Sequence, residues 1–137
     1  MSTRAYIGIK NENGSVTAIF NKCDGGLGYL GHLLRKYFKT EEQVRELLGF
    51  GDISSIQNME QYNYRKNLFP SFNDTEWKDL NTVSSLKVHL MQNGEPAEEL
   101  NDIEDVMDYM ICYAYLFIPE ECKWYYTKGK GLEPLKA

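Results

Sequence analysis

The chain opens with MSTRAYIGIKNENGSVTAIFNKCDGGLGYLGHLLRKYFKTEEQVRELLGFGDISSI, residues 1–56, whose successive patterns set the expected architecture. Apolar residues alternate with others over residues 4–9 and again over residues 16–20, which is typical of half-buried strands. Asn13-Gly14 lies between these stretches and is a strong turn signal. Residues 4–22 are therefore predicted to form an antiparallel hairpin.

Two helices are expected after the hairpin. Leucines recur at helical spacing over residues 27–38, and Arg35 and Lys36 stand near the end of this stretch, where the helix dipole favours cations. Thr40 followed by Gln43 is a capping-box signal for a second, shorter helix that ends before Gly49. Residues 1–56 are thus predicted to be a hairpin plus two helices.

The rest of the chain divides into three segments. Residues 57–82 carry scattered aromatic and polar residues without a sustained period, so we expect an irregular segment with a short helical turn near 74–80. Residues 83–128 are predicted to form a strand at 86–90, an acidic amphipathic helix around 103–110, and a hairpin from the apolar run 111–118 and residues 122–127. Residues 129–137 are expected to form a loose tail.

These elements predict an α+β fold in one domain, residues 1–137. We expect an antiparallel sheet of four to five strands with the helices packed on one face, leaving the other face to solvent or a partner. A hydrophobic fraction of 42% with ten tyrosines is too high for a disordered chain. We found no membrane-spanning run and no secretory signal, and the three cysteines are irregularly spaced, so a cytoplasmic protein without a disulfide framework is expected.

Charge is distributed unevenly along the chain. Residues 88–122 contain nine carboxylates and no lysine or arginine, so this segment carries −9 and the rest of the chain carries +4 of the net −5. Such a field attracts basic surfaces of other proteins and disfavours direct DNA binding. The predicted partner-binding residues are Glu98, Glu99, Asp102, Asp105, Asp108 and Tyr109. A solvated helix face explains the same carboxylates without a partner.

A nucleotide site is an alternative. Residues 26–31, GLGYLG, match G-x-G-x-x-G before a predicted helix, but a hairpin precedes them and a helix follows, so a Rossmann unit is disfavoured. Backbone amides there could still face a phosphate, while nearby cations and aromatic rings hold a base. The candidate nucleotide-binding residues are Gly26, Gly28, Tyr62, Tyr64 and Arg65. A tight strand-to-helix corner explains the glycines without a ligand.

Catalysis and metal binding have weaker sequence support. If the initiator methionine is removed, Ser2 becomes the terminal residue, and residues 2–10 loosely resemble the start of N-terminal-nucleophile hydrolases, whose terminal hydroxyl attacks the substrate. Outside that alternative we expect no catalytic residue. Cys23, His32 and His89 lack metal-ligand spacing, so no metal site and no cofactor are expected.

Four motifs resemble the opening of small proteins encoded by bacteriophages and prophages. They are the MSTR start, Asp24-Gly25 after the second strand, the apolar helix at 27–38 and the GDISSI closure at 51–56. Asn21-Lys22-Cys23 departs from the aromatic and histidine of similar proteins, so no role for that histidine is carried over. The resemblance implies an anti-defence protein in the cytoplasm of a host bacterium. It would inhibit a host effector, such as a CRISPR nuclease or another protein–RNA complex, or sequester a signalling nucleotide; homo-oligomerisation is left open.

Overall fold

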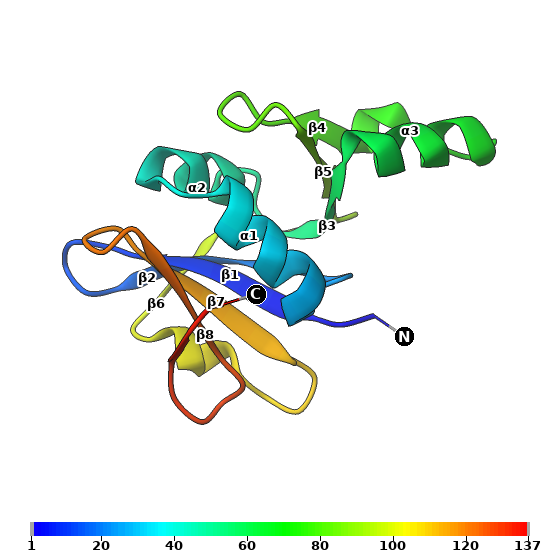
Figure 1. The fold of residues 1–137 in the computed structure, drawn as a ribbon. Coiled ribbons are helices and arrows are strands. Elements are labelled where there is room, and N and C mark those ends of the chain that lie inside the picture. The colour runs from blue at the N-terminus through cyan, green and yellow to red at the C-terminus, as the bar shows by residue number, and fades with distance from the viewer. Residues whose placement is uncertain (1, 137) are drawn as a thin grey trace.

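The computed structural model describes residues 2–136, which form a nine-stranded mixed sheet and three α-helices (Figure 1). The strands are β1 (Ala5–Lys10), β2 (Val16–Asn21), β3 (Ile53–Asn58), β4 (Trp77–Asp79), β5 (Leu86–Leu90), β6 (Glu98–Leu100), β7 (Tyr113–Ile118), β8 (Lys123–Thr127) and β9 (Glu133–Pro134). The helices are α1 (His32–Tyr37), α2 (Glu41–Leu48) and α3 (Met59–Leu68), with a π-helical turn η1 (Leu27–Gly31) and 3-10 turns η2 (Asp74–Glu76) and η3 (Ile103–Val106). Within residues 2–136, no helix is long and apolar enough to span a lipid bilayer.

The predicted antiparallel sheet of four to five strands is wrong. The strands follow the order β4-β5-β3-β2-β1-β7-β8-β9, with β6 paired to β2 outside this path. β1 pairs antiparallel with β2, placing Ile7 opposite Ile19, but it pairs parallel with β7, placing Ile7 opposite Tyr115. Parallel pairing joins segments far apart in the sequence, and no local pattern in the first hairpin reveals it.

The predicted elements of residues 1–56 are confirmed locally. β1 and β2 form the hairpin, and its turn closes with a 2.9 Å hydrogen bond from Gly14 N–H to the Asn11 carbonyl. Thr40 and Gln43 form both bonds of the capping box at the start of α2. The first predicted helix begins as the π-helical turn η1 before it becomes α1.

Both faces of the central strands are covered, contrary to the expectation that one face is open. Ile7, Ile9 and Phe117 belong to the larger core cluster, which also contains apolar residues of α1 and α2. On the opposite face, Ile103 of η3 packs into a second cluster with Ala18. Figure 1 shows α1 and α2 on one side of β1 and β7, and η3 on the other side. The two apolar sets alternate along each strand, so one hairpin supplies both cores.

Residues 57–82 were expected to be mostly irregular but contain the ten-residue helix α3. Asn58 and Gln61 form a capping box at its start, and Tyr62 is its one buried residue. Because only one position is buried, the helix lacks the apolar period that would have revealed it. Tyr62 packs against Phe72 and Trp77, with ring centroids 5.5 and 5.3 Å away.

The acidic helix predicted around residues 103–110 is also wrong. Residues 98–100 form strand β6, which pairs antiparallel with β2, and helical structure is limited to the four residues of η3. The expected loose tail at 129–137 instead contains β9, which pairs with β8, and Leu135, whose exposure is 5%. β6 is thus held by a strand distant in sequence, whereas β9 is held by the strand that precedes it.

The corner before η1 contains Gly25 and Gly26, and replacing each by alanine tests whether that position has room for a side chain. A Cβ at Gly25 would lie 2.8 Å from Ala5 Cβ and 2.8 Å from the Thr3 carbonyl oxygen, whereas a Cβ at Gly26 would meet no atom within 4 Å. Gly25→Ala should lower the free energy of unfolding by about 1–3 kcal/mol through overpacking. Gly26 has φ −70° and ψ 160°, so Gly26→Ala should be neutral or stabilise by up to about 1 kcal/mol. Urea denaturation of both variants checks this, and equal losses would contradict the assigned packing role of Gly25.

Candidate functional site

A polar cluster lies where the end of the first hairpin, η1, β3 and the start of α3 meet. We call it the polar junction and define it by Asp24, Tyr29, Ser55, Gln57 and Gln61. Ser55 and Gln57 are 3% and 2% exposed, although both are polar. Buried polar side chains need hydrogen-bond partners inside the protein, and here they find them in one another.

Tyr29 is at the centre of the polar junction. Its hydroxyl donates to the Ile56 carbonyl at 2.7 Å, and the side-chain oxygens of Gln57 and Gln61 lie 3.2 and 3.0 Å from it. Burial, followed by the negative charge of Asp24, raises the pKa of Tyr29 to about 12. The phenol therefore stays protonated over the whole physiological pH range and acts as a hydrogen-bond donor.

Gln57 connects two of the four motifs on which the resemblance to phage-encoded proteins rests. Its Nε2 lies 3.5 Å from Asp24 Oδ2 and 3.2 Å from Ser55 Oγ. Asp24 comes from the Asp-Gly motif and Ser55 from the GDISSI motif. Beside them Asn21 is fully buried, and its Oδ1 is the one buried side-chain polar atom without a partner among the described residues. The motifs thus meet at the polar junction, which sequence distance alone does not reveal.

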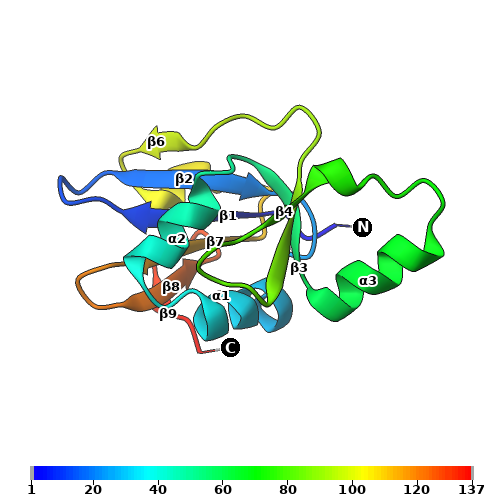
Figure 2. The same cartoon turned by 90° about the horizontal axis from the view of Figure 1, so that it is seen from above.

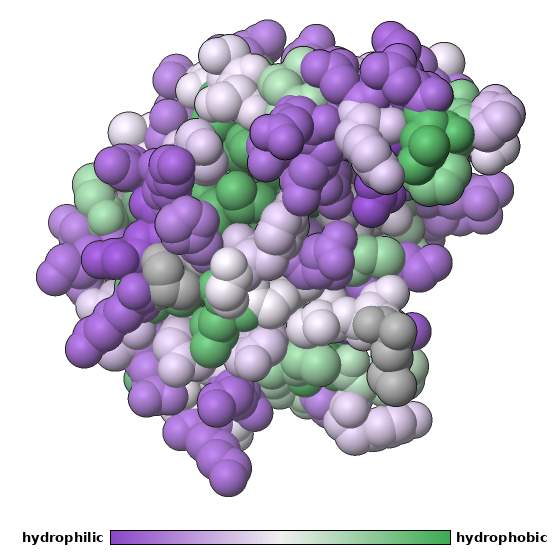
Figure 3. Space-filling view, turned by 45° about the vertical axis from the view of Figure 1, so that its right-hand side comes forward, coloured by the Kyte–Doolittle hydropathy of each residue, from purple (hydrophilic) through white to green (hydrophobic). Residues whose placement is uncertain are grey.

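A hollow of about 510 Å³ opens beside the polar junction along α3. We call it the α3 hollow; it is lined by Gln57, Glu60, Gln61, Tyr64, Arg65 and Phe69. Tyr64 and Phe69 are 64% and 51% exposed. Figure 2 shows α3 projecting beside the sheet, and Figure 3 shows a hydrophobic spot among hydrophilic side chains toward the upper right. Exposed rings next to a guanidinium and amides can stack on a planar group and bind an anion.

The structure brings together part of the predicted nucleotide site. Tyr64 and Arg65 line the α3 hollow, whereas Tyr62 points to the other side of α3 and donates to Asp74. Gly26 and Gly28 are outside the lining. The glycine corner instead contributes Tyr29 to the polar junction. This residue lies within the G-x-G-x-x-G pattern, but the sequence analysis did not single it out.

The predicted partner-binding residues lie together on β6, η3 and the turn that follows, a surface we call the acidic face. Asp102 and Asp105 form the capping box of η3, and Asp108 accepts from the Met110 N–H at 2.7 Å. Glu98 is exposed, and Tyr109 is 98% exposed. Among residues 2–136 the ion pairs are Arg45–Glu41, Lys87–Asp79 and His89–Glu76, so the carboxylates of the acidic face are not neutralised by an ion pair.

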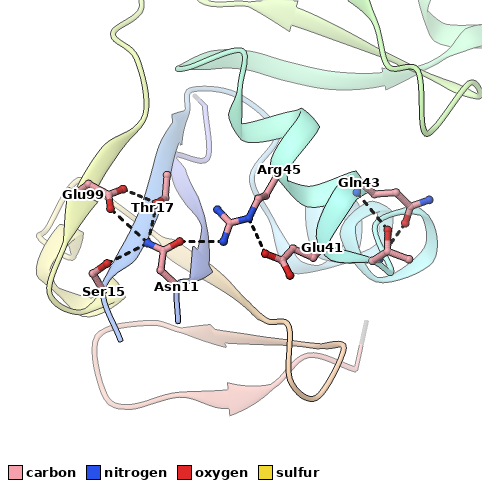
Figure 4. Close-up of polar contacts among 8 residues, drawn as sticks. Asn11, Ser15, Thr17, Glu41, Gln43, Arg45 and Glu99 are labelled. Atoms are coloured by element: carbon pink, nitrogen blue, oxygen red, sulfur yellow. Dashed lines mark hydrogen bonds and ion pairs between the residues drawn. The ribbon is translucent and has the colours of Figure 1, made fainter. Parts of the chain in front are cut away.

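Glu99 has a structural role within the acidic face. It accepts from the Thr17 hydroxyl, and the Asn11 amide lies 3.4 Å away (Figure 4). Asn11 in turn accepts from Arg45 of α2 at 3.0 Å. Arg45 also pairs with Glu41. This network ties β6 to α2, so Glu99 stabilises the fold whether or not a partner binds.

Ser2 is exposed, and its hydroxyl lies 3.5 Å from Cys23 Sγ. Cys23, Cys112 and Cys122 are free thiols. Over the part of the chain that the structure describes, no group of three or more His, Cys, Asp or Glu side chains could hold a metal ion.

Tyr29→Phe tests the polar junction. Removing the hydroxyl leaves buried acceptors without their donor, so the free energy of unfolding should fall by about 1–2 kcal/mol near pH ~7. Because the pKa of Tyr29 is raised in the folded state, its stabilisation is complete below pH ~10 and is lost as the pH rises toward ~12. The difference between wild type and variant should therefore shrink over that window. Urea denaturation as a function of pH measures it, with Tyr37→Phe, half-buried outside the junction, as the control.

Comparisons with family models, curated proteins and solved structures found no match to this chain. The resemblance to phage-encoded proteins therefore stays an expectation carried by its four sequence motifs. The polar junction, where two of these motifs meet, is the structural feature from which a function is best argued.

Proposed function

We propose that this chain is a non-catalytic binding protein that captures a nucleotide-type small molecule in the α3 hollow. The observation that carries the proposal is the joining, in one hollow, of two exposed aromatic rings and a guanidinium, beside two amides and the carboxylate of Glu60. Its volume of about 510 Å³ lies within the range of small-molecule sites, roughly 300–1,000 Å³.

Each part of the hollow suits one part of a nucleotide. Arg65 can hold a phosphate through parallel N–H donors, because its guanidinium is planar and permanently charged. Tyr64 offers a π-face on which a base can stack. Gln61 is partly exposed, and its amide Nε2 can donate to the hydrogen-bonding edge of a base, whereas Gln57 is 2% exposed and its amide is bonded within the polar junction. Their orientation is fixed from behind by Tyr29.

The biological role we propose follows from the resemblance to phage-encoded proteins. Bacterial defence systems that signal through a cyclic nucleotide or a cyclic ADP-ribose-like molecule fail if the signal is bound before it reaches its effector. A protein that sequesters the signal in the host cytoplasm has to bind the signalling molecule tightly but does not have to catalyse a reaction. A hollow that offers stacking and hydrogen-bonding groups agrees with this role.

Thermal denaturation with a panel of cyclic mononucleotides, cyclic dinucleotides and cyclic ADP-ribose tests the proposal. A true ligand at a hundred times its Kd adds about 2.7 kcal/mol and should raise Tm by about 9 °C. Arg65→Ala and Tyr64→Ala should abolish the shift, while Lys78→Ala, an exposed lysine on β4 away from the hollow, should keep it. A panel in which no compound raises Tm, or equal shifts in all variants, would refute it.

A second candidate function is inhibition of a host defence effector through the acidic face. The specific observation in its favour is the set of carboxylates without ion pairs beside the exposed ring of Tyr109, since uncompensated charge with an exposed aromatic residue is suited to a basic protein surface. A CRISPR nuclease complex, whose nucleic-acid channel is basic, is one such partner.

Biolayer interferometry with purified CRISPR nuclease complexes tests this second candidate. Binding should weaken about tenfold or more between about 50 and about 500 mM NaCl, because salt screens exposed charges. The double variant Glu98→Gln/Tyr109→Ala should bind at least about tenfold more weakly, since it removes exposed groups without touching the caps of η3. Glu42→Gln on α2 is the control with the same charge change outside the acidic face. Salt-independent binding would exclude the electrostatic mode.

A further inference from the structure

A second hollow, of about 700 Å³, lies on the opposite end of α1 from the polar junction. We call it the basic groove. Its lining combines one side of α1 and the residues after it, residues 122–124 at the start of β8, and residues 134–136 at the end of β9 and beyond it. The cationic side chains that line it are Arg35, Lys36, Lys39, Lys123 and Lys136. Three segments far apart in the sequence thus place their cations around one hollow, in a chain of net charge −5.

The backbone of the basic groove is fixed by hydrogen bonds between these segments. Trp124 donates its indole N–H to the Phe38 carbonyl at 2.8 Å, and Leu135 N–H donates to the Trp124 carbonyl at 3.0 Å. Arg35 donates to the Lys136 carbonyl at 3.3 Å. The floor is apolar because Phe38, Trp124 and Leu135 are all buried. The backbone that carries the cations is therefore preformed, so ligand binding has to order only their side chains.

Among residues 2–136, no ion pair compensates the charge of the basic groove. No aspartate or glutamate is among its lining residues, and none of its cations takes part in the ion pairs found among residues 2–136. The ammonium of Lys36 lies 5.2 Å from the ring centre of Tyr37, a contact that leaves its charge in place. The dipole of α1 accounts for cations on its last turn, but Lys123 and Lys136 are not on that helix.

We propose that the basic groove binds a compact oligophosphate, either free or as the phosphate tail of a small molecule. Several lysines and an arginine around one hollow match an anion of several closely spaced charges. A long nucleic-acid strand fits less well, since Glu121 and Glu133 directly flank the lining segments in the sequence and would repel a polyanion that extends past them. The buried Trp124 offers no ring face for stacking, so the phosphates are the recognised group.

Isothermal titration calorimetry with inorganic tripolyphosphate tests the proposal. We expect saturable one-to-one binding that weakens as NaCl is raised. Lys39→Glu/Lys123→Glu should weaken it at least about tenfold by reversing two charges of the groove. The double variant Lys22→Glu/Lys78→Glu changes the net charge equally at exposed positions outside the groove and should stay within about threefold of wild type. Circular dichroism melting confirms that both variants are folded.

Further ligands separate the sources of the phosphate. Equal affinities for tripolyphosphate and ATP would assign recognition to the phosphates alone, and tighter binding of ATP would assign a nucleotide; both support the groove. A single-stranded oligonucleotide that binds more tightly than either would overturn the proposal in favour of a nucleic-acid surface. Absence of tripolyphosphate binding, or equal losses in the two double variants, would also overturn it.

Discussion

The side chain of Asp52 stabilises the position along β2 where one edge of this strand stops pairing with β6 and begins to pair with β3. β6 pairs with β2 at Val16 to Ala18, while β3 reaches β2 at Asn21. Between these pairings, the N–H of Phe20 donates to Asp52 Oδ1 at 2.9 Å. The other carboxylate oxygen accepts from Glu95 N–H at 3.1 Å. One side chain therefore takes the place of a strand partner and ties down the segment that leads to β6.

The polar junction and the acidic face both depend on this divided edge of β2. Gly51, at φ +75°, brings the chain so close to Glu95 that a Cβ there would lie 2.6 Å from its carbonyl oxygen. From that point β3 runs to the polar junction and α3, while residue 95 begins the approach to the acidic face. Within the GDISSI motif, Gly51 and Asp52 therefore stabilise the arrangement of β2, β3 and the segment that leads to β6, whereas Ser55 is part of the polar junction. A short motif can combine both roles because alternate residues of a strand face different neighbours.

Sequence patterns predicted the elements whose signal is local. The hairpin and α2 have their turn and capping residues within a few positions, and these bonds form as expected. The parallel pairing of β1 with β7 has no local signal, so the size and type of the sheet were missed. The helix start at Asn58 and Gln61 was present in the sequence, but α3 buries Tyr62 alone, and periodicity could not reveal it. Ile103 and Val106 have helical spacing, yet four residues of 3-10 turn are enough to place Ile103 in the core.

Some residues of the candidate site could likewise be predicted from the local sequence, whereas others depend on contacts between segments far apart in the chain. Tyr64 and Arg65 could be chosen from residue type, since an exposed ring beside a cation is a recognition pattern in itself. Tyr29, Gln57 and Gln61 could not, because their contact requires η1, β3 and α3 to meet. The Asp-Gly and GDISSI motifs carried a useful signal, because they contribute Asp24 and Ser55 to the polar junction from separate parts of the sequence.

Net charge conceals the electrostatic character of this molecule. The acidic face lies across the sheet from α1, whose end carries part of the basic groove, so these two charged regions are separated by the core (Figure 1). Separated charge creates a field that orients an approaching charged molecule before contact. An anion is drawn toward the basic groove and repelled from β6, while a basic protein surface experiences the reverse. Under the two proposals, the faces select ligands of opposite sign, and their separation means that binding at one does not compete with binding at the other.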